Sequence, residues 1–232
     1  MTKLSIRQMR RSELSQAAFE TLVEHGTRGA TIDRVAKRAG VSKSVVLHHY
    51  GDKDALFEGV MRRANNLIRD SVVELLRHAQ SPEERISAIV VGNFAAPVFH
   101  QEVCRAWICL CADVPYNKQS QRIQTVIHAR MRSNLLNALK MLNLDDDLSS
   151  VADQIRTTID GVWLCASLRE MPMTSREGID YVNDAIIRLL GVKEELRQKI
   201  LNASQKMETL AEIILNSKAF MQKALIIPKH PA

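Results

Sequence analysis

TIDRVAKRAGVSKSVVLHHYGDK, residues Thr31–Lys53, is the stretch that decides the fold of the amino-terminal part of this chain. It holds two short segments with helical apolar spacing, Ile32–Ala39 and Ser42–His49, on either side of the pair Gly40-Val41. Threonine and serine at the starts of these segments are residues that cap helix amino termini. The glycine between them can take the left-handed backbone conformation that a tight turn requires. This order predicts a helix-turn-helix, a unit whose second helix enters the major groove of DNA.

The charge of this region suits a polyanionic partner. Residues 1–50 carry nine Lys and Arg residues against four Asp and Glu residues, a net charge of +5 out of +6 for the whole chain. A basic module of this kind fits nucleic acid. An ordinary solvated basic face is the alternative that charge alone leaves open.

Two adjacent histidines, His48 and His49, end the second segment. A neutral imidazole can donate or accept a hydrogen bond, so either ring could contact a phosphate or a base edge. Neighbouring side chains on a helix point about 100° apart, which makes joint binding of one metal ion unfavourable. A buried structural role for His49 under the turn is the alternative to DNA contact. We therefore predict no metal site here.

The remaining sequence has a helical pattern throughout. Gly and Pro number 9 and 6 in 232 residues, and we find no strand alternation of useful length and no internal repeat. Ser81-Pro82-Glu83-Glu84 and Thr174-Ser175-Arg176-Glu177 each predict a helix start with a capping box. The sequence thus predicts an all-α fold.

The compartment can also be anticipated. No run of 18 apolar residues occurs, and the amino terminus MTKLSIRQMRRSEL lacks the apolar centre of a signal peptide. The four cysteines form no CxxC pair. We expect no membrane span and a reducing, cytoplasmic location.

The carboxy-terminal segment repeats apolar or small residues in alternating steps of four and three. These are Leu196, Ile200, Ala203, Met207, Leu210, Ile214, Ser217, Met221 and Ala224. Such spacing suits packing against another helix, as in a coiled coil. The interpretation we favour is an amphipathic helix that lies on its own domain, because the pattern does not fix the partner.

A family signature can be read across the opening stretch. It runs Thr31-Ile32-x-x-Val35-Ala36-x-x-Ala39-Gly40-Val41-Ser42 and continues His49-Tyr50-x-x-Lys53-x-x-Leu56. This resembles the signature of the TetR family of bacterial repressors over about Arg10–Phe57. The chain departs from the usual pattern at Ser44, Leu47 and Tyr50, where glycine, tyrosine and phenylalanine are common. Loss of the tyrosine puts one phosphate contact in doubt.

The resemblance implies a domain plan and a function. We expect a three-helix DNA-binding domain (1–54), a larger helical ligand-binding and dimerisation domain (55–190), and an extra carboxy-terminal helix and tail (191–232). The expected function is that of a homodimeric transcriptional repressor, released from a palindromic DNA operator by a small-molecule effector. Helices around Ser149–Arg169 and Ser175–Leu190 would form the four-helix dimer contact.

The predicted DNA contacts fall into groove-facing and backbone-contacting residues. They are Arg28, Thr31, Ser42, Lys43, Ser44, Val45, Leu47, His48, His49, Tyr50 and Lys53. Arg28 and Lys53 are expected at the phosphate backbone. Tyr50 is expected to divide between the core and a phosphate contact.

Three further segments narrow the resemblance. IVVGNF (Ile89–Phe94), RAW (Arg105–Trp107) and IDGVWLCASL (Ile159–Leu168) are similar to the choline-responsive subgroup of the family, which regulates glycine-betaine synthesis. A quaternary ammonium ion is held by aromatic faces through cation–π attraction. The effector residues that this implies are Asn93, Phe94, Trp107, Leu110, Cys111, Asp160 and Trp163, with Asp160 as countercharge. Phe99 and Tyr116 are further candidate rings, and core packing is the alternative for each ring.

One departure leaves the effector open. Leu110 and Cys111 stand where the subgroup tends to carry more aromatic residues. The effector could therefore be a different apolar or acyl molecule, or a thiol or redox signal read by Cys104, Cys109 and Cys111. A nonspecific architectural DNA-binding protein is the alternative outside regulation. No catalytic triad, phosphate loop or paired carboxylate stands out, so we predict no enzyme, no metal and no cofactor.

Overall fold

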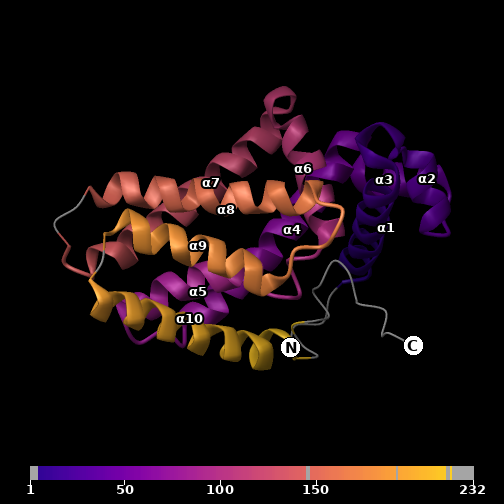
Figure 1. The fold of residues 1–232 in the computed structure, drawn as a ribbon. Coiled ribbons are helices and arrows are strands. Elements are labelled where there is room, and N and C mark those ends of the chain that lie inside the picture. Colours follow the sequence, from indigo (N-terminus) through magenta and orange to yellow (C-terminus); the bar gives the residue numbers. More distant parts are fainter. Residues whose placement is uncertain (1–4, 145–146, 192, 218–219, 221–232) are drawn as a thin grey trace. The chain divides into compact units, whose positions relative to one another are not determined.

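The computed structural model describes residues 5–144, 147–191, 193–217 and 220. Every regular element in this described part is helical, which confirms the predicted all-α fold (Figure 1). The elements are α1 (Ile6–Gly29), α2 (Ile32–Arg38), α3 (Lys43–Tyr50), α4 (Lys53–Leu76), α5 (Pro82–Phe94), α6 (Gln101–Asp113), the 3-10 turn η1 (Val114–Tyr116), α7 (Lys118–Lys140), α8 (Leu148–Leu168), α9 (Ser175–Leu189) and α10 (Glu194–Leu215). None of the helices described is long and apolar enough to cross a bilayer.

The chain divides into two compact units. One contains the residues up to Asn65 together with Arg105–Ile123, and the other contains Asn66–Cys104 and the residues from Gln124 onward. The helices α4, α6 and α7 each contribute residues to both units. The domain boundaries expected after residues 54 and 190 stay predictions.

Helix ends follow the local sequence closely, with one difference at the start of α5. Gly26 breaks the regular backbone of α1 at φ +62°, and one more turn follows before α1 ends at Gly29. The Thr174–Glu177 capping box is present. At the start of α5 the prediction was half wrong. The Ser81 hydroxyl accepts from the Glu84 amide, but the Glu84 carboxylate accepts from the Gln80 amide instead of closing the box on Ser81.

The first unit has a small core under the predicted helix-turn-helix. Its centre consists of side chains that are at most 1% exposed, namely Leu14, Phe19, Leu22, Val35, Val46, Leu56, Val60 and Met61. They come from α1, α2, α3 and α4. The apolar spacing of each short helix therefore faces inward, which leaves the opposite side of α3 to solvent.

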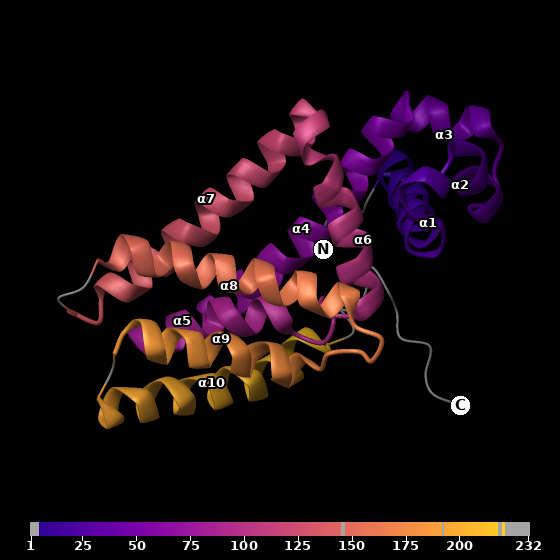
Figure 2. The same ribbon diagram turned by 45° about the horizontal axis from the view of Figure 1, so that its top comes forward.

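The second unit is built around α5, whose residues from Ile86 to Phe94 are all buried. A Cβ at Gly92 would lie 2.8 Å from Val72 Cα of α4, so glycine permits a close approach of these two helices. The helix α10 packs on α5 and α9 through Ile200, Ala203, Met207, Ala211 and Leu215 (Figure 1, Figure 2).

This packing confirms that the carboxy-terminal helix lies on its own domain. Ion pairs join it to its neighbours: Lys206 lies 2.7 Å from Glu84, and Glu208 lies 2.9 Å from Arg176. Met221 and Ala224, the last two positions of the apolar repeat, lie outside the described residues.

Candidate nucleic-acid interface and effector site

The helix-turn-helix is formed as the sequence predicts. Gly40 takes φ +65° between α2 and α3, and the Val41 amide donates to the Ala36 carbonyl at 3.0 Å. Thr31 caps α2 by accepting from the Arg34 amide. The turn is therefore fixed by backbone hydrogen bonds, and a side chain at Gly40 would strain it because of the positive φ.

The predicted DNA-contact residues of α3 lie mostly on its outer side. Ser42, Lys43, Ser44, Leu47 and His48 are exposed, while Val45 and His49 are half-buried. The Ser42 hydroxyl lies 2.8 Å from the Ser44 hydroxyl and caps no amide of α3. The amides at the start of this helix are thus left to other acceptors, and phosphate oxygens are suitable ones.

Lys43 forms an exposed ion pair that does not hold its side chain in one position. Its ammonium lies 3.0 Å from Asp33, and both side chains are more than half exposed. An exposed pair of this kind contributes little to stability. Lys43 can therefore exchange Asp33 for a phosphate or a base at low cost.

Tyr50 belongs mainly to the core. Its ring is 9% exposed, and its hydroxyl donates to the Arg11 carbonyl at 2.8 Å. The Arg11 guanidinium lies 4.2 Å from the ring centroid, a cation–π contact. Burial raises the pKa of the Tyr50 hydroxyl. The core part of the expectation is thus observed, while a phosphate contact would require the hydroxyl to leave Arg11.

The backbone-contact candidates differ in how they are held. The Lys53 ammonium donates to the Thr27 carbonyl at 2.9 Å and lies 5.7 Å from the Phe57 ring. Arg28 is exposed and makes no hydrogen bond or ion pair within the described part of the chain. Their contacts with phosphate stay predictions.

The two histidine rings contact each other. Their ring centroids are 5.3 Å apart with the rings edge to face. His49 Nδ1 is buried without a hydrogen-bond partner, and partial burial, followed by the charges of His48 and three arginines, lowers the pKa of His49. Within the described ranges no group of three metal-ligating side chains occurs.

The effector residues in the second unit are packed tightly. Asn93, Phe94 and Trp163 are at most 4% exposed. Phe99 joins the two predicted rings, at 5.0 Å from the Phe94 centroid and 5.5 Å from the Trp163 centroid, edge to face in both cases. The Asn93 amide donates to the Ile89 carbonyl at 2.8 Å. Core packing therefore describes these rings as the structure stands.

Asp160, the predicted countercharge, already has two partners. Its carboxylate lies 3.1 Å from Arg156 and 3.4 Å from His128 Nε2. Burial raises the pKa of Asp160, and interaction with His128 and Arg156 opposes that rise. A cationic effector would have to compete with Arg156 and His128 for this carboxylate.

The effector residues of α6 lie in the first unit. Leu110 is 6% exposed, and Trp107 and Cys111 are half-buried. Tyr116, the further ring considered, is 88% exposed and encloses no ligand by itself. In the second unit, burial raises the pKa of the Cys104 thiol to about 12. A thiol with so little thiolate is a poor redox sensor.

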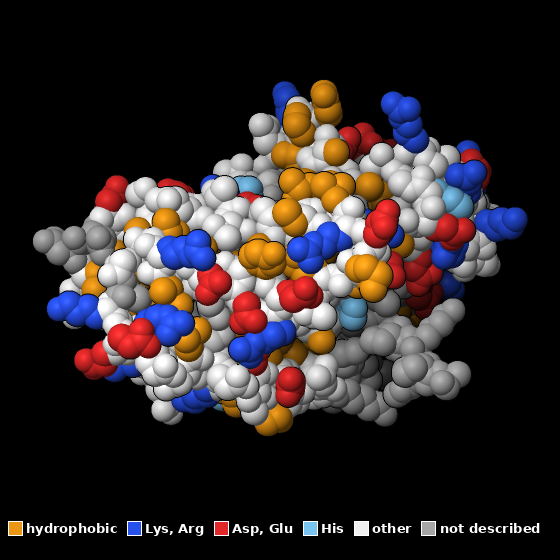
Figure 3. Space-filling view, viewed as in Figure 1, with side chains coloured by type: hydrophobic (Ala, Val, Ile, Leu, Met, Phe, Trp, Pro, Cys, Tyr) orange, Lys and Arg blue, Asp and Glu red, His pale blue; other side chains and the backbone are white. Residues whose placement is uncertain are grey.

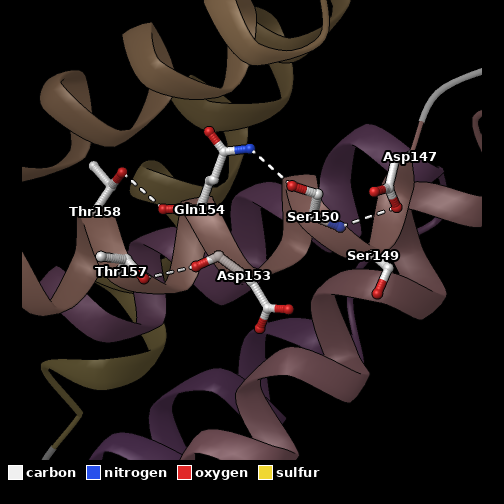
Figure 4. Close-up of a pocket in the computed structure, with 7 residues that line it drawn as sticks. All are labelled: Asp147, Ser149, Ser150, Asp153, Gln154, Thr157 and Thr158. Carbon is white, nitrogen blue, oxygen red and sulfur yellow. Dashed lines mark hydrogen bonds between the residues drawn. The ribbon is translucent and has the colours of Figure 1, made fainter.

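A polar groove of about 620 Å³, which was not predicted from the sequence, lies along α8. It is lined by Asp147, Ser149, Ser150, Asp153, Gln154, Thr157 and Thr158 (Figure 4). The polar spacing of three and four along this helix was the signal for it. The Thr157 and Thr158 hydroxyls donate to carbonyls one turn earlier, so the surface is polar but internally bonded. The groove shares no residue with the predicted effector site.

Comparison with known families gives two matches. Residues 14–60 match the family described as bacterial regulatory proteins, tetR family. Residues 82–191 match the family described as BetI-type transcriptional repressor, C-terminal.

Known proteins agree with these matches. The HTH-type transcriptional regulator BetI of Rhizobium meliloti is 30% identical over 187 residues, which cover 79% of this chain and 92% of that protein. Its counterpart in Escherichia coli is 34% identical over 176 residues, 75% of this chain and 90% of that protein.

Solved structures share the fold at lower identity. A transcriptional regulator from Rhodococcus sp. Rha1 has a TM-score of 0.69 at 21% identity, over 78% of this chain and 96% of that one. A putative regulator from Saccharomonospora viridis in complex with choline also has a TM-score of 0.69, at 16% identity and with the same two coverages.

Proposed function

The chain belongs to the TetR family of transcriptional repressors, with a BetI-type carboxy-terminal domain, and from this premise we propose how it acts. Two copies bind the half-sites of a near-palindromic operator in the cytoplasm. A small quaternary amine of the choline type binds in the helical domain and releases them. Release follows only to the extent that the effector binds one arrangement of the two DNA-binding heads better than the other.

The observation that carries DNA binding is the exposed side of α3. Lys43, Ser44, Leu47 and His48 project from a helix whose inner side, at Val46, is fully buried. This helix is held at a fixed turn, so its outer side chains are available to base edges while its orientation is kept. Two such helices, one DNA turn apart, read a palindrome.

The proposed homodimer rests on the outer side of α8 and α9 and on the loop between them. Leu164, Leu168, Met171 and Tyr181 are between 43% and 79% exposed, although all four are large apolar residues. Figure 3 shows apolar side chains among charged ones on the face that α8 and α9 present. Exposed apolar side chains of this size favour burial against another surface. We assign them to the two-fold contact between copies.

Choline as the effector class is supported by the relatives and by chemistry. The Saccharomonospora viridis regulator holds choline on the same fold. In this chain Phe94, Phe99 and Trp163 form a linked set of aromatic rings. Aromatic faces attract a quaternary ammonium by about 0.5–2 kcal/mol per ring. Because the rings are packed against one another, binding would have to open a space between them.

DNA binding is tested with the fragment upstream of the chain's own gene and a random duplex of equal length. We expect preference for the upstream fragment, with log Kd rising linearly with log salt concentration. Lys53→Ala weakens both complexes, whereas His48→Ala mainly reduces the difference between them. Equal binding to both duplexes would favour the architectural alternative, and no binding at any salt would refute the proposal.

The effector is tested by thermal shift with choline, betaine aldehyde, other amines and fatty acyl compounds. We expect choline to raise the Tm of the wild type and to have less effect on Trp163→Phe. Tyr116→Ala, which removes an exposed ring, should respond like the wild type. Stabilisation by an acyl compound alone would identify the alternative class of effector.

A further inference from the structure

The first two turns of α1 carry a cluster of arginines that the family comparison does not cover. Arg7, Arg10 and Arg11 precede residue 14, where the match to the tetR family begins. A capping box between Ser5 and Gln8 closes the start of this helix. The two turns are therefore a defined part of α1, and Arg7 and Arg10 are exposed on it.

Arg11 links this part of α1 to the end of α3, the helix proposed to enter the DNA groove and called the recognition helix below. Its guanidinium lies over the Tyr50 ring and also donates to the His49 carbonyl. The Tyr50 hydroxyl returns a hydrogen bond to the Arg11 carbonyl at 2.8 Å. Three contacts across 38 or 39 residues of sequence thus hold the arginine cluster beside the carboxy-terminal end of α3.

The charges around His49 are almost entirely positive. Those that act on its ring come from His48 on its own helix and from Arg7, Arg11 and Arg10 on α1. Glu13 is the acid nearest in sequence to the arginines of α1, and its carboxylate is 2.7 Å from Arg10. The Arg7 side chain makes no hydrogen bond or ion pair among the residues described. Several cations therefore converge beside His49, and one of them, Arg10, is paired with a carboxylate.

We propose that Arg7, Arg10 and His49 form a phosphate contact beside the recognition helix, and that this contact takes up a proton when duplex DNA binds. The inference rests on the proposed function, because it requires the recognition helix to lie on DNA. The occupant is a backbone phosphodiester, since guanidinium groups bind phosphate through paired N–H donors. The contact carries no sequence information and adds to the affinity for any duplex.

Uptake of a proton by His49 follows from the same arrangement of charges. In the free protein, partial burial and the neighbouring cations lower the pKa of His49, so the ring is mostly neutral at pH 7. A bound phosphate offsets those positive charges and favours the imidazolium. The complex therefore binds more protons than the free protein, and DNA affinity rises as pH falls.

The first test uses salt. Full-length protein is titrated onto a fluorescein-labelled duplex of random sequence, which requires no knowledge of the operator. Loss of one phosphate contact lowers the slope of log K against log salt by about 0.9. We expect this for Arg7→Ala, with several-fold weaker binding, and we expect Arg7→Lys to keep the slope. Arg197→Ala, which removes an exposed arginine of α10, is the matched control and should behave as the wild type.

The second test uses pH at constant salt. Between pH 8 and pH 6 the wild type should bind the same duplex progressively more tightly, by up to about tenfold for each unit by which phosphate raises the pKa of His49. His49→Gln should lose most of this dependence, while His78→Gln, at an exposed histidine just after α4, should keep it. Melting temperatures of all variants exclude misfolding as the cause.

The outcomes separate the two proposals. Wild-type protein that binds no duplex at any salt overturns the function and this contact together. Wild-type binding with an unchanged slope in Arg7→Ala, or an unchanged pH dependence in His49→Gln, overturns the contact and leaves the repressor function standing.

Discussion

Val46 and Leu47 are adjacent apolar residues on α3 with different environments. Val46 is fully buried and Leu47 is 36% exposed, because neighbouring side chains point about 100° apart on a helix. The helical period of the sequence predicts this difference. It does not predict the environment of Asp160, whose partner His128 lies on another helix.

The His128–Asp160 pair gives a pH prediction at the residue scale. Burial lowers the pKa of His128, and the charge of Asp160 opposes this shift. The side-chain nitrogen of Gln124 lies 2.8 Å from Nε2 of the same ring. The unfolded chain, with an ordinary histidine pKa near 6.5, therefore takes up the proton first as pH falls. Stability contributed by the neutral ring is present above pH 6.5 and is lost below it. His128→Gln should lose less folding stability than the wild type between pH 7.5 and pH 5.5.

Urea unfolding at the two pH values measures this difference. His78→Gln, at an exposed histidine, is the control and should follow the wild type. An equal loss of stability in His128→Gln and the wild type would show that another group is responsible.

At the scale of elements, the packing of neighbouring helices around α5 determines the structure of the second unit. From Ile86 to Phe94 the sequence of α5 is mostly apolar, and all of these residues are buried, so this part of the helix is covered on every side. The helices α9 and α10 supply part of that cover, and α4 approaches at Gly92. The family match ends at residue 191, so α10, which covers α5, lies beyond the matched part of the chain.

Met207 and Ile213 test the cover that α10 provides. Met207 is fully buried and Ile213 is 68% exposed on the same helix. Met207→Ala should lower the free energy of unfolding by about 2–4 kcal/mol through lost burial and a cavity. Ile213→Ala should change it by less than about 0.5 kcal/mol. Denaturant unfolding compares the two, and equal small effects would mean that α10 is not firmly packed.

Gly92 and Gly161 form a second matched pair. A Cβ at Gly92 would meet the Val72 backbone at 2.8–2.9 Å, whereas nothing lies within 4 Å of one at Gly161 of α8. Gly92→Ala should therefore push α5 away from α4 and destabilise the fold by about 1–3 kcal/mol, despite better helix propensity. Gly161→Ala should stabilise a single copy by up to about 1 kcal/mol. Thermal unfolding at low protein concentration distinguishes them, and a stable Gly92→Ala would contradict the close approach.

At the scale of the whole molecule, the exposed apolar side chains of α8 and α9 lead to a prediction about assembly. Leu168 is 74% exposed, so a charge there costs the single copy little. In a two-fold contact the same charge would face a desolvated surface or its own copy. Leu168→Glu should therefore yield monomers with operator binding weakened at least tenfold.

Light scattering after gel filtration measures the assembly, and anisotropy with the upstream fragment measures binding. Glu212→Lys, a charge reversal at an exposed residue of α10, is the control and should stay dimeric. A Leu168→Glu variant that remains a dimer would place the contact elsewhere.

The sequence by itself determined the helices and the DNA-binding unit. Helix starts at Thr31, Thr174 and Ser81, and the turn at Gly40, are local: they depend on hydrogen bonds within five residues and on one backbone conformation. The apolar period also predicted that α10 has an inner face.

Only the tertiary structure decided which charged and aromatic side chains have partners within the chain. Tyr50 is engaged by Arg11 across 39 residues, and Glu84 by Lys206 across 122. Asp160, which was predicted to pair with a cationic effector, contacts Arg156 and His128. Phe94 and Trp163 both contact Phe99. These partners meet because apolar faces pack, and the packing energy depends on the shape of the whole core and not on spacing along one helix.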